Sequence, residues 1–420
     1  MFSVPSVVQI LAYPFICSFT LLLTLGSPCI AQEWSRFRGP NGSGVAENVS
    51  FPAEWTEDDY LWKAELPGKG HGSPIGWGDT IYVTAGDSES GDVKLLALDV
   101  ASGEPRWTET FPGSTYRMHQ ANSYASSTPA ADEQHVYLSI GQGRQLVVHA
   151  VTHDGKPVWK RNLGEYAGVH GFGVSPVVAD GVVCVQCDTA DGGFLSGLDA
   201  ASGKLLWKIE RPPGKASYAT PCVYETAEQG RAFVSCSMEG GMQAIEVSSG
   251  KLLWEFPRVF PARTVSSPLL AAGEVFSQCG GGGNGKQLVS VPIPGSGDTQ
   301  PAKPAIFSRN IPYVPTPVVV EDRMYLWHDR GKVNCLGLLT GESLWVERVG
   351  GNYFGSPIVA GDKIYCMSVD GEVVVISAGE KFEVLGRNAL DEPTNATPAV
   401  FKKKLLLRTE SKLFCLPDNG

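Results

Sequence analysis

The stretch Leu195-Ser-Gly-Leu-Asp199-Ala-Ala-Ser-Gly203-Lys-Leu-Leu-Trp207 decides the fold, because it is one copy of a phrase that recurs along the chain. Further copies end at Trp107, Trp254 and Trp345, and a looser copy ends at Trp159. An apolar run, a turn with Asp and Gly, and a second apolar run are typical of two antiparallel strands joined by a hairpin. Recurrence of such a unit predicts a repeat architecture.

A second phrase precedes these copies: Ser or Thr, then Pro, then a short apolar run. It occurs at eight places: Ser73-Pro74, Thr128-Pro129, Ser175-Pro176, Thr220-Pro221, Ser267-Pro268, Thr316-Pro317, Ser356-Pro357 and Thr397-Pro398. The mean spacing of these prolines is about 46 residues, which is in the range of propeller blades. Pro suits the start of an edge strand, where its nitrogen is not needed as a ladder donor.

These units predict an all-β fold, an eight-bladed β-propeller built of four-stranded antiparallel blades. The last unit, residues 397–416, lacks the Gly turn and the Trp-bearing strand, whereas an orphan strand over 60–68 precedes the first complete unit. We therefore expect the N-terminal strand to complete the eighth blade and close the ring, which removes open sheet edges. The alternative is an open solenoid, and the matching ends argue against it.

Tryptophans near the outer strands are expected to fill the gaps between neighbouring blades. The step from Trp254 to Trp345 is two periods, so the unit between Pro268 and Pro317 lacks its tryptophan.

The composition excludes two classes of protein. Hydrophobic residues make up 43% and charged residues 19%, which is too apolar for a disordered chain. The formal net charge of −10 opposes non-specific binding of nucleic acid, so no nucleic-acid partner is expected.

The N-terminus is typical of an export signal. Residues 7–25 are nearly all apolar, and the small residues Cys29 and Ala31 precede Gln32 as at a cleavage site. Because no Lys or Arg precedes the apolar run, an uncleaved membrane anchor is the alternative. We predict a signal peptide over 1–31, an extension over 32–59 and the propeller over 60–420. The mature chain would be a monomeric ring in the periplasm or outside the cell, with no stable membrane span.

Over about residues 60–416 the chain resembles the PQQ-like β-propeller repeat family, on the phrase that ends at Trp207 and its copies. The opening Trp34-Ser-Arg-Phe-Arg-Gly-Pro-Asn-Gly-Ser-Gly44 is similar to a subfamily of exported bacterial proteins. The wider family includes quinoprotein dehydrogenases, which bind pyrroloquinoline quinone and calcium. It also includes the propeller lipoprotein of the outer-membrane assembly complex, which binds proteins without catalysis. The resemblance implies the fold, but it does not decide whether the protein is an enzyme or a non-catalytic binding protein.

The positions of the cysteines favour a non-catalytic binding protein over a quinoprotein dehydrogenase. Quinoprotein dehydrogenases of this family place a disulfide between adjacent cysteines against the quinone, and no two cysteines here are adjacent. No set of calcium ligands with a catalytic Asp can be carried over, so we expect no cofactor, with quinone and calcium as the alternative. Cys184 and Cys187 lie three apart on an expected strand and point to opposite faces, which disfavours a shared metal. Eight cysteines follow the cleavage site, and their pairing stays open: Cys184, Cys187, Cys222, Cys236, Cys279, Cys335, Cys366 and Cys415.

Two stretches partly match known ligand-binding motifs. Residues 280–286 fit a phosphate-binding GxxxxGK loop, but Gln287 stands where Ser or Thr must bind magnesium. The stretch lies between two expected strands, so we interpret it as a hairpin. Asp188-Thr-Ala-Asp191-Gly-Gly193 is too short for a calcium loop and is also interpreted as a hairpin turn.

Candidate ligand-binding residues come from the loops before each Ser/Thr-Pro, which converge on the central funnel of a propeller. They are His71, Arg117, His119, Asn122, Tyr124, His170, Phe172, Tyr218, Arg263, Tyr313, Tyr353 and Asn395. This mixture of aromatic, Arg and amide side chains suits a protein, peptide or glycan. The alternative is that these side chains only fill the funnel.

Within this set, two finer hypotheses concern charge and metal. His71, His119 and His170 come from consecutive blades and are candidate metal ligands. Arg117 and Arg263 are candidates to clamp a carboxylate.

The sequence thus predicts a non-catalytic recognition or scaffolding protein of the cell envelope. The alternative is a quinone- or metal-dependent oxidoreductase that uses the same funnel. A glycan hydrolase or lyase is disfavoured, because such enzymes need paired carboxylates and the funnel loops carry almost no Asp or Glu.

Overall fold

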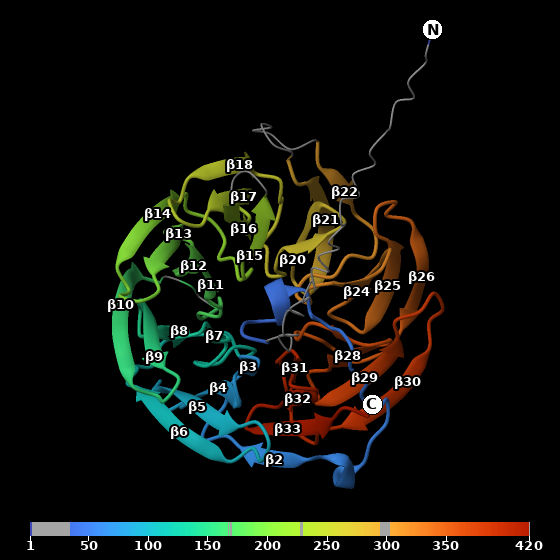
Figure 1. The fold of residues 1–420 in the computed structure, drawn as a ribbon, viewed down its shortest axis with the longest axis horizontal. Coiled ribbons are helices and arrows are strands. Elements are labelled where there is room, and N and C mark those ends of the chain that lie inside the picture. The colour runs from blue at the N-terminus through green and yellow to red at the C-terminus, as the bar shows by residue number, and fades with distance from the viewer. Residues whose placement is uncertain (2–33, 167, 169, 227–229, 295–302, 420) are drawn as a thin grey trace. The chain divides into compact units, whose positions relative to one another are not determined.

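The computed structural model describes residues 1, 34–166, 168, 170–226, 230–294 and 303–419, and Gln32–Gly420 form one compact unit. The signal-peptide prediction falls almost wholly outside the described residues. Eight separate sheets form a ring (Figure 1), and each contains a blade of four antiparallel strands. One sheet has a fifth strand, the short parallel strand β1 (Val45–Ala46) beside β27 (Ile358–Ala360). Among the described residues, helical structure is limited to two short 3-10 turns, and none of their helices has the length and apolar character needed to cross a membrane. The predicted fold is confirmed.

The blades follow one another along the chain. Blades 1 to 4 are made of β3 (Ile75–Trp77), β4 (Thr80–Gly86), β5 (Val93–Asp99), β6 (Pro105–Phe111); β7 (Ala130–Ala131), β8 (His135–Gln142), β9 (Gln145–Thr152), β10 (Pro157–Glu165); β11 (Val177–Ala179), β12 (Val182–Thr189), β13 (Gly192–Asp199), β14 (Leu205–Arg211); and β15 (Cys222–Thr226), β16 (Gly230–Ser237), β17 (Gly241–Glu246), β18 (Leu252–Phe256). Blades 5 to 7 are made of β19 (Leu269–Ala271), β20 (Glu274–Gly281), β21 (Asn284–Pro292), β22 (Ala305–Phe307); β23 (Val318–Val320), β24 (Arg323–Trp327), β25 (Lys332–Gly337), β26 (Ser343–Arg348); and β27 (Ile358–Ala360), β28 (Lys363–Met367), β29 (Glu372–Ser377), β30 (Val384–Ala389).

Blade 8 joins the two ends of the chain. Its strands are β31 (Ala399–Phe401), β32 (Lys404–Arg408), β33 (Lys412–Pro417) and, outermost, β2 (Trp62–Glu65). The register pairs Trp62 with Cys415 and Glu65 with Lys412. The predicted closure by an N-terminal strand is confirmed, and Figure 1 shows blue β2 lying beside red β33.

The Ser/Thr-Pro phrases form a circle of hydrogen bonds around the axis. In each link, the backbone N–H of the Ser or Thr donates to the hydroxyl of the Ser or Thr in the next blade. Seven such links are Ser73 to Thr128, Thr128 to Ser175, Thr220 to Ser267, Ser267 to Thr316, Thr316 to Ser356, Ser356 to Thr397 and Thr397 to Ser73, at 2.8–3.2 Å. All eight side chains are buried. We call this set the hydroxyl circle.

Tryptophans fill the outer gaps between blades, as expected. The indole N–H groups of Trp62, Trp107, Trp159 and Trp207 each donate to a backbone carbonyl in the turn of the following blade. The ring of Trp62 lies flat against Gly103, where a Cβ would come within 2.5 Å of it, and the φ of Gly103 is +74°. The turn therefore requires glycine both for its backbone and for the ring that covers it.

Blade 5 carries the unit without a tryptophan. Phe307 of its outer strand β22 lies against Gly341 of blade 6, where a Cβ would come within 1.9 Å of the ring. Phe307 therefore takes the place of the missing indole, and the joint between blades 5 and 6 keeps the same form.

The segment before β2 crosses the centre of the ring and contacts several blades. It contains the turn η1 (Pro40–Gly42), β1 (Val45–Ala46) and the turn η2 (Glu57–Asp59). The carbonyls of Trp34 and Ser35 accept from the N–H groups of Gly76 and Ala131, on the inner strands of blades 1 and 2. Strand β1 pairs in parallel with β27 of blade 7. The segment therefore packs against the inner strands of blades 1, 2 and 7.

Two arginines fix this segment to blades 4 and 6. Arg38 is fully buried and donates to the carbonyls of Thr316 and Pro317 at 2.8 and 2.7 Å, and Arg36 donates to the carbonyl of Pro221. Burial lowers the pKa of Arg36 to about 10 and that of Arg38 to about 9. The inner strands are sheet edges with free carbonyls, and these guanidinium groups supply the donors.

Replacing Trp62 by Ala should weaken ring closure. The change removes the packing on Gly103 and leaves a cavity, at a cost of about 3–5 kcal/mol in the free energy of unfolding. Urea unfolding followed by circular dichroism measures this loss. Leu61→Ala is the matched control, since Leu61 is 50% exposed and its loss should cost under about 0.5 kcal/mol. Equal stability of the two variants would contradict the closure.

Replacing Thr316 by Val should destabilise the protein by about 1–3 kcal/mol, because the buried N–H of Ser267 loses its acceptor while the shape is preserved. Thr108→Val on the exposed side of β6 is the control and should change the unfolding free energy by under about 0.5 kcal/mol. A Thr316 variant as stable as the control would show that the hydroxyl circle contributes little.

Candidate functional site

A cavity of about 510 Å³ lies at the centre of the ring, and we call it the central cavity. Its walls come from the loops that precede the inner strands and from the hydroxyl circle, and Phe37 of the crossing segment also lines it. Eight of the predicted ligand-binding residues line it: His71, His119, Asn122, His170, Tyr218, Arg263, Tyr313 and Asn395. The topology therefore brings together side chains from residues 71 to 395 at one place.

Four predicted site residues do not line the central cavity. Phe172 and Tyr353 are buried in the core, where Phe172 packs on Tyr166 and Tyr353 on Trp327. The Tyr124 hydroxyl binds main-chain atoms of its own loop, and Arg117 is exposed to solvent. Large apolar rings stabilise the fold more between blades than at a wet surface, which explains why Phe172 and Tyr353 lie in the core and not in the cavity wall.

Several polar atoms in the cavity wall have no hydrogen-bond partner among the described residues. These buried atoms include His71 Nδ1, His170 Nδ1, Arg263 Nε and Asn395 Oδ1. His170 Nε2 lies 3.5 Å from Arg263 Nη1 of the guanidinium group, which can only donate. Nε2 is therefore the acceptor, and the neutral ring carries its proton on Nδ1. Buried polar groups are normally paired, and these atoms are therefore available to a ligand that enters the cavity.

His71 and His170 are held in their neutral forms. Burial, then the charge of Arg408, lowers the pKa of His71 to about 4. Burial, then Arg263 and His119, also lowers the pKa of His170. The rings of His119 and His170 stack with their centres 5.5 Å apart, whereas His71 Nε2 faces the amide of Asn395 at 3.5 Å. Neutral imidazoles here act as hydrogen-bond donors and acceptors.

The three histidines do not form a metal site. Across the part of the chain that the structure describes, no three His, Cys, Asp or Glu side chains come close enough to share an ion. Stacking turns His119 and His170 face to face, and His119 Nδ1 accepts from the N–H of Ala121 at 3.2 Å. The rings therefore do not converge on one point.

The donor set also does not fit a quinone held by calcium. Calcium requires several carboxylate or carbonyl oxygens, and none of the residues lining the central cavity is Asp or Glu. All eight cysteines after the predicted cleavage site are free and buried. Burial raises the pKa of Cys184 and Cys187 far above the physiological range, so these are core thiols and not a redox pair.

Sequence reasoning missed part of the cavity wall. Phe37 and Phe354 contribute apolar surface, and Ser126 and Val265 lie between the polar loop residues. The signal for Phe37 was present in the opening motif, but its place in the ring depends on contacts with strands hundreds of residues away.

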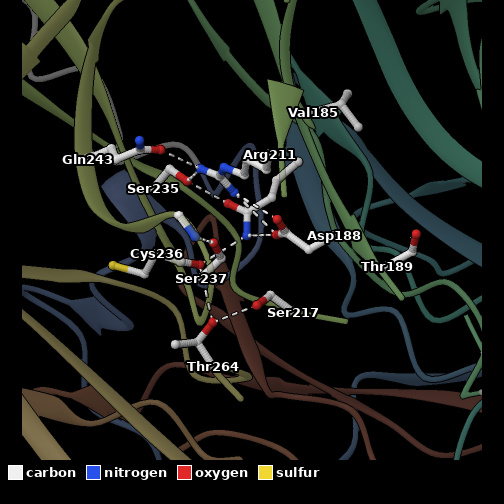
Figure 2. Close-up of polar contacts among 12 residues, drawn as sticks. Val185, Asp188, Thr189, Arg211, Ser217, Ser235, Cys236, Ser237, Gln243 and Thr264 are labelled. Atoms are coloured by element: carbon white, nitrogen blue, oxygen red, sulfur yellow. Dashed lines mark hydrogen bonds and ion pairs between the residues drawn. The ribbon is translucent and has the colours of Figure 1, made fainter. Parts of the chain in front are cut away.

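A separate polar cluster is buried between blades 3 and 4 (Figure 2). Arg211 binds both oxygens of Asp188 at 3.2 Å and also reaches Ser235 and Gln243 of the next blade. Asp188 was predicted to lie in a hairpin turn, but it is the buried end of β12, and only the turn after Thr189 is a hairpin. Burial raises the pKa of Asp188 in spite of Arg211. The side chains of this cluster bind one another and so join two blades. The Asp188 oxygens are bound to Arg211 and are not free to coordinate calcium.

A sequence profile described as outer membrane protein assembly factor BamB matches residues 54–144, 94–227 and 298–415, more than half of the chain. The chain belongs to this family. A BamB from Marinobacter adhaerens is 24% identical over 108 residues, which are 26% of this chain and 27% of that relative. The match therefore spans only about a quarter of that curated relative.

Solved structures confirm the fold. The crystal structure of BamB from Moraxella catarrhalis has a TM-score of 0.62 at 16% identity, covering 85% of this chain and 97% of that one. The quinohemoprotein alcohol dehydrogenase from Comamonas testosteroni has a TM-score of 0.63 at 12% identity, covering 93% and 82%. Both a protein assembly factor and an oxidoreductase thus share this architecture, and the site must decide between the two roles.

His71 should titrate near pH 4 in the folded protein, and an NMR titration of its ring measures this directly. Since its unfolded pKa is about 6.5, the unfolded state binds more protons below that value. The contribution of His71 to stability is therefore present above pH 6.5 and is lost as the pH falls toward 4. Titration near 6.5 in the folded protein would contradict the burial of this ring.

Proposed function

We propose that this chain is a non-catalytic binding or scaffolding propeller of the cell envelope, which recognises its ligand at the central cavity. The observation that carries the proposal is the set of unpartnered polar atoms on His71, His170, Arg263 and Asn395 in the cavity wall. A preformed wall on a closed ring loses little conformational entropy when a ligand binds, so such atoms can contribute to affinity.

A protein or peptide partner is favoured over a glycan. The wall combines amide, imidazole and guanidinium groups with apolar surface, and Phe354 at the cavity is 38% exposed. Arg and aromatic side chains are the residues that contribute most to protein–protein binding. The family description, outer membrane protein assembly factor, agrees with a protein partner and with a place in the cell envelope. The export signal predicted over residues 1–31 supports the same location.

The oxidoreductase is the alternative, and its support is the fold alone. The cavity offers Arg263 for an acidic cofactor but no carboxylate for the calcium that would hold a quinone. No reaction step is therefore derived for this site.

The test places a photo-crosslinking amino acid at Phe354 in cells that contain the natural partners. We expect a crosslinked protein of defined mass from Phe354 and none from Leu344, an exposed residue of outer strand β26 that serves as control. Arg263→Ala should lower the affinity for that protein about 10- to 100-fold, as loss of a central Arg does at interfaces. Arg117→Ala removes the same charge outside the cavity and should have little effect.

Two results would overturn the proposal. Crosslinks of equal yield from Phe354 and Leu344, or equal effects of the two Arg variants, would remove the central cavity from the interaction. A saturable rise in the unfolding temperature with pyrroloquinoline quinone and calcium would instead favour the oxidoreductase.

A further inference from the structure

A second hollow of about 320 Å³ lies between blades 5 and 6. One wall is the tip of the β20–β21 hairpin at Gly283, and the other is the turn between β24 and β25 together with the end of β26. Gly283 also lines the central cavity, so the two hollows adjoin. We call this hollow the basic pocket, because Arg330, Lys332 and Arg348 line it.

The three cations of the basic pocket have no carboxylate partner within the described ranges of the chain. Some exposed Lys and Arg side chains elsewhere form ion pairs, as Arg387 does with Glu372 and Lys402 with Asp79. Lys332 and Arg348 are direct partners across the β25–β26 ladder. Like charges in this position destabilise a sheet, so the arrangement costs stability unless an anion lies between them.

The one carboxylate among the lining residues is already bound. Asp329 accepts the backbone N–H groups of Tyr313 and Val314 at 2.7 and 3.1 Å. Both of its oxygens are therefore occupied by main-chain donors. The charge that faces the pocket stays positive although the whole chain carries a net charge of −10.

An unpartnered imidazole atom completes the wall. His328 Nε2 is buried without a hydrogen bond and belongs to a residue that lines the basic pocket. Burial lowers the pKa of His328 to about 4, and Lys332 acts in the same direction. An anion in the pocket would reverse the effect of Lys332 and allow Nε2 to become a donor.

The glycine tip lies beside Arg330. Gly282 and Gly283 have φ values of +63° and +71°, and a Cβ at Gly283 would lie 3.8 Å from the Arg330 guanidinium. The stretch 280–286 is a hairpin, as predicted, and therefore not a phosphate-binding loop that precedes a helix. The hairpin brings its glycine tip to cations supplied by the next blade.

We propose that the basic pocket binds a phosphate group, either free or as part of a phosphate ester or lipid headgroup. Three cations exceed the charge of a single carboxylate, whereas a phosphate carries up to two negative charges with oxygens that Arg binds in a bidentate way. This inference does not depend on the partner proposed for the central cavity.

The first experiment measures the binding of inorganic pyrophosphate and phosphate to the mature chain by calorimetry at low ionic strength. Arg330→Ala with Arg348→Ala should raise the Kd for pyrophosphate at least tenfold. The matched control is Lys204→Ala with Lys251→Ala, which removes two exposed charges from the turns of blades 3 and 4 and should change the Kd by less than twofold. Equal losses in the two double variants, or no binding to the unaltered protein, would overturn the proposal.

A spectroscopic readout separates binding from a structural role. Saturating phosphate should raise the pKa of His328 in an NMR titration by about one unit or more, because a nearby negative charge favours the protonated ring. An unchanged His328 pKa in the presence of bound phosphate would place the phosphate elsewhere and contradict the proposal.

Vesicles distinguish the source of the phosphate. Flotation with phosphatidylglycerol vesicles that depends on Arg330 and Arg348 would assign the pocket to a lipid headgroup. Binding of pyrophosphate without flotation would assign it to a soluble phosphate. Flotation that is reduced equally by the Lys204 and Lys251 changes would count against the pocket.

Discussion

The ring depends on one interaction, the hydrogen bond from a backbone N–H in one blade to the side-chain hydroxyl of the next. An inner strand is a sheet edge, and the Pro that begins it cannot donate. The residue before Pro therefore supplies both a donor for the next blade and an acceptor for the previous one, as Thr316 does between Ser267 and Ser356. The link from Thr397 to Ser73 joins the last blade to the first. The Ser/Thr-Pro phrase is present in every unit, although one unit has lost its tryptophan.

The crossing segment supplies part of the wall of the central cavity. Arg38 is fully buried and bound to carbonyls of blade 6, while Phe37 beside it faces the central cavity. The floor and the walls are thus fixed by contacts made far from the loops that carry the polar side chains. Recognition can then rest on atoms such as Arg263 Nε, which are held in place before a ligand arrives. Loop residues on a rigid scaffold are the usual carriers of such a function.

Much of the fold could be predicted from the sequence, because the repeat encodes each blade locally. The eight Ser/Thr-Pro copies gave the number of blades, and the orphan strand around Trp62 gave the closure. The site was predicted less completely. The position of His71 and Arg263 in the loops predicted that they lie at the cavity, where the structure has them. The same criterion also selected Phe172 and Tyr353, which are buried in the core. An aromatic side chain on a loop can point into the cavity or pack between two blades. The choice depends on contacts between blades, which a local sequence pattern does not reveal.

Native-state hydrogen exchange measures whether the ring is closed and preformed. The backbone N–H groups of Ser73, Thr316 and Thr397 should exchange only through global unfolding, with one common opening free energy. The joint between blades 8 and 1 should then be as protected as the joints elsewhere in the ring. If the N–H of Thr397 instead exchanged orders of magnitude faster than that of Thr316, the ring would open at its ends. The central cavity would then not be a preformed site.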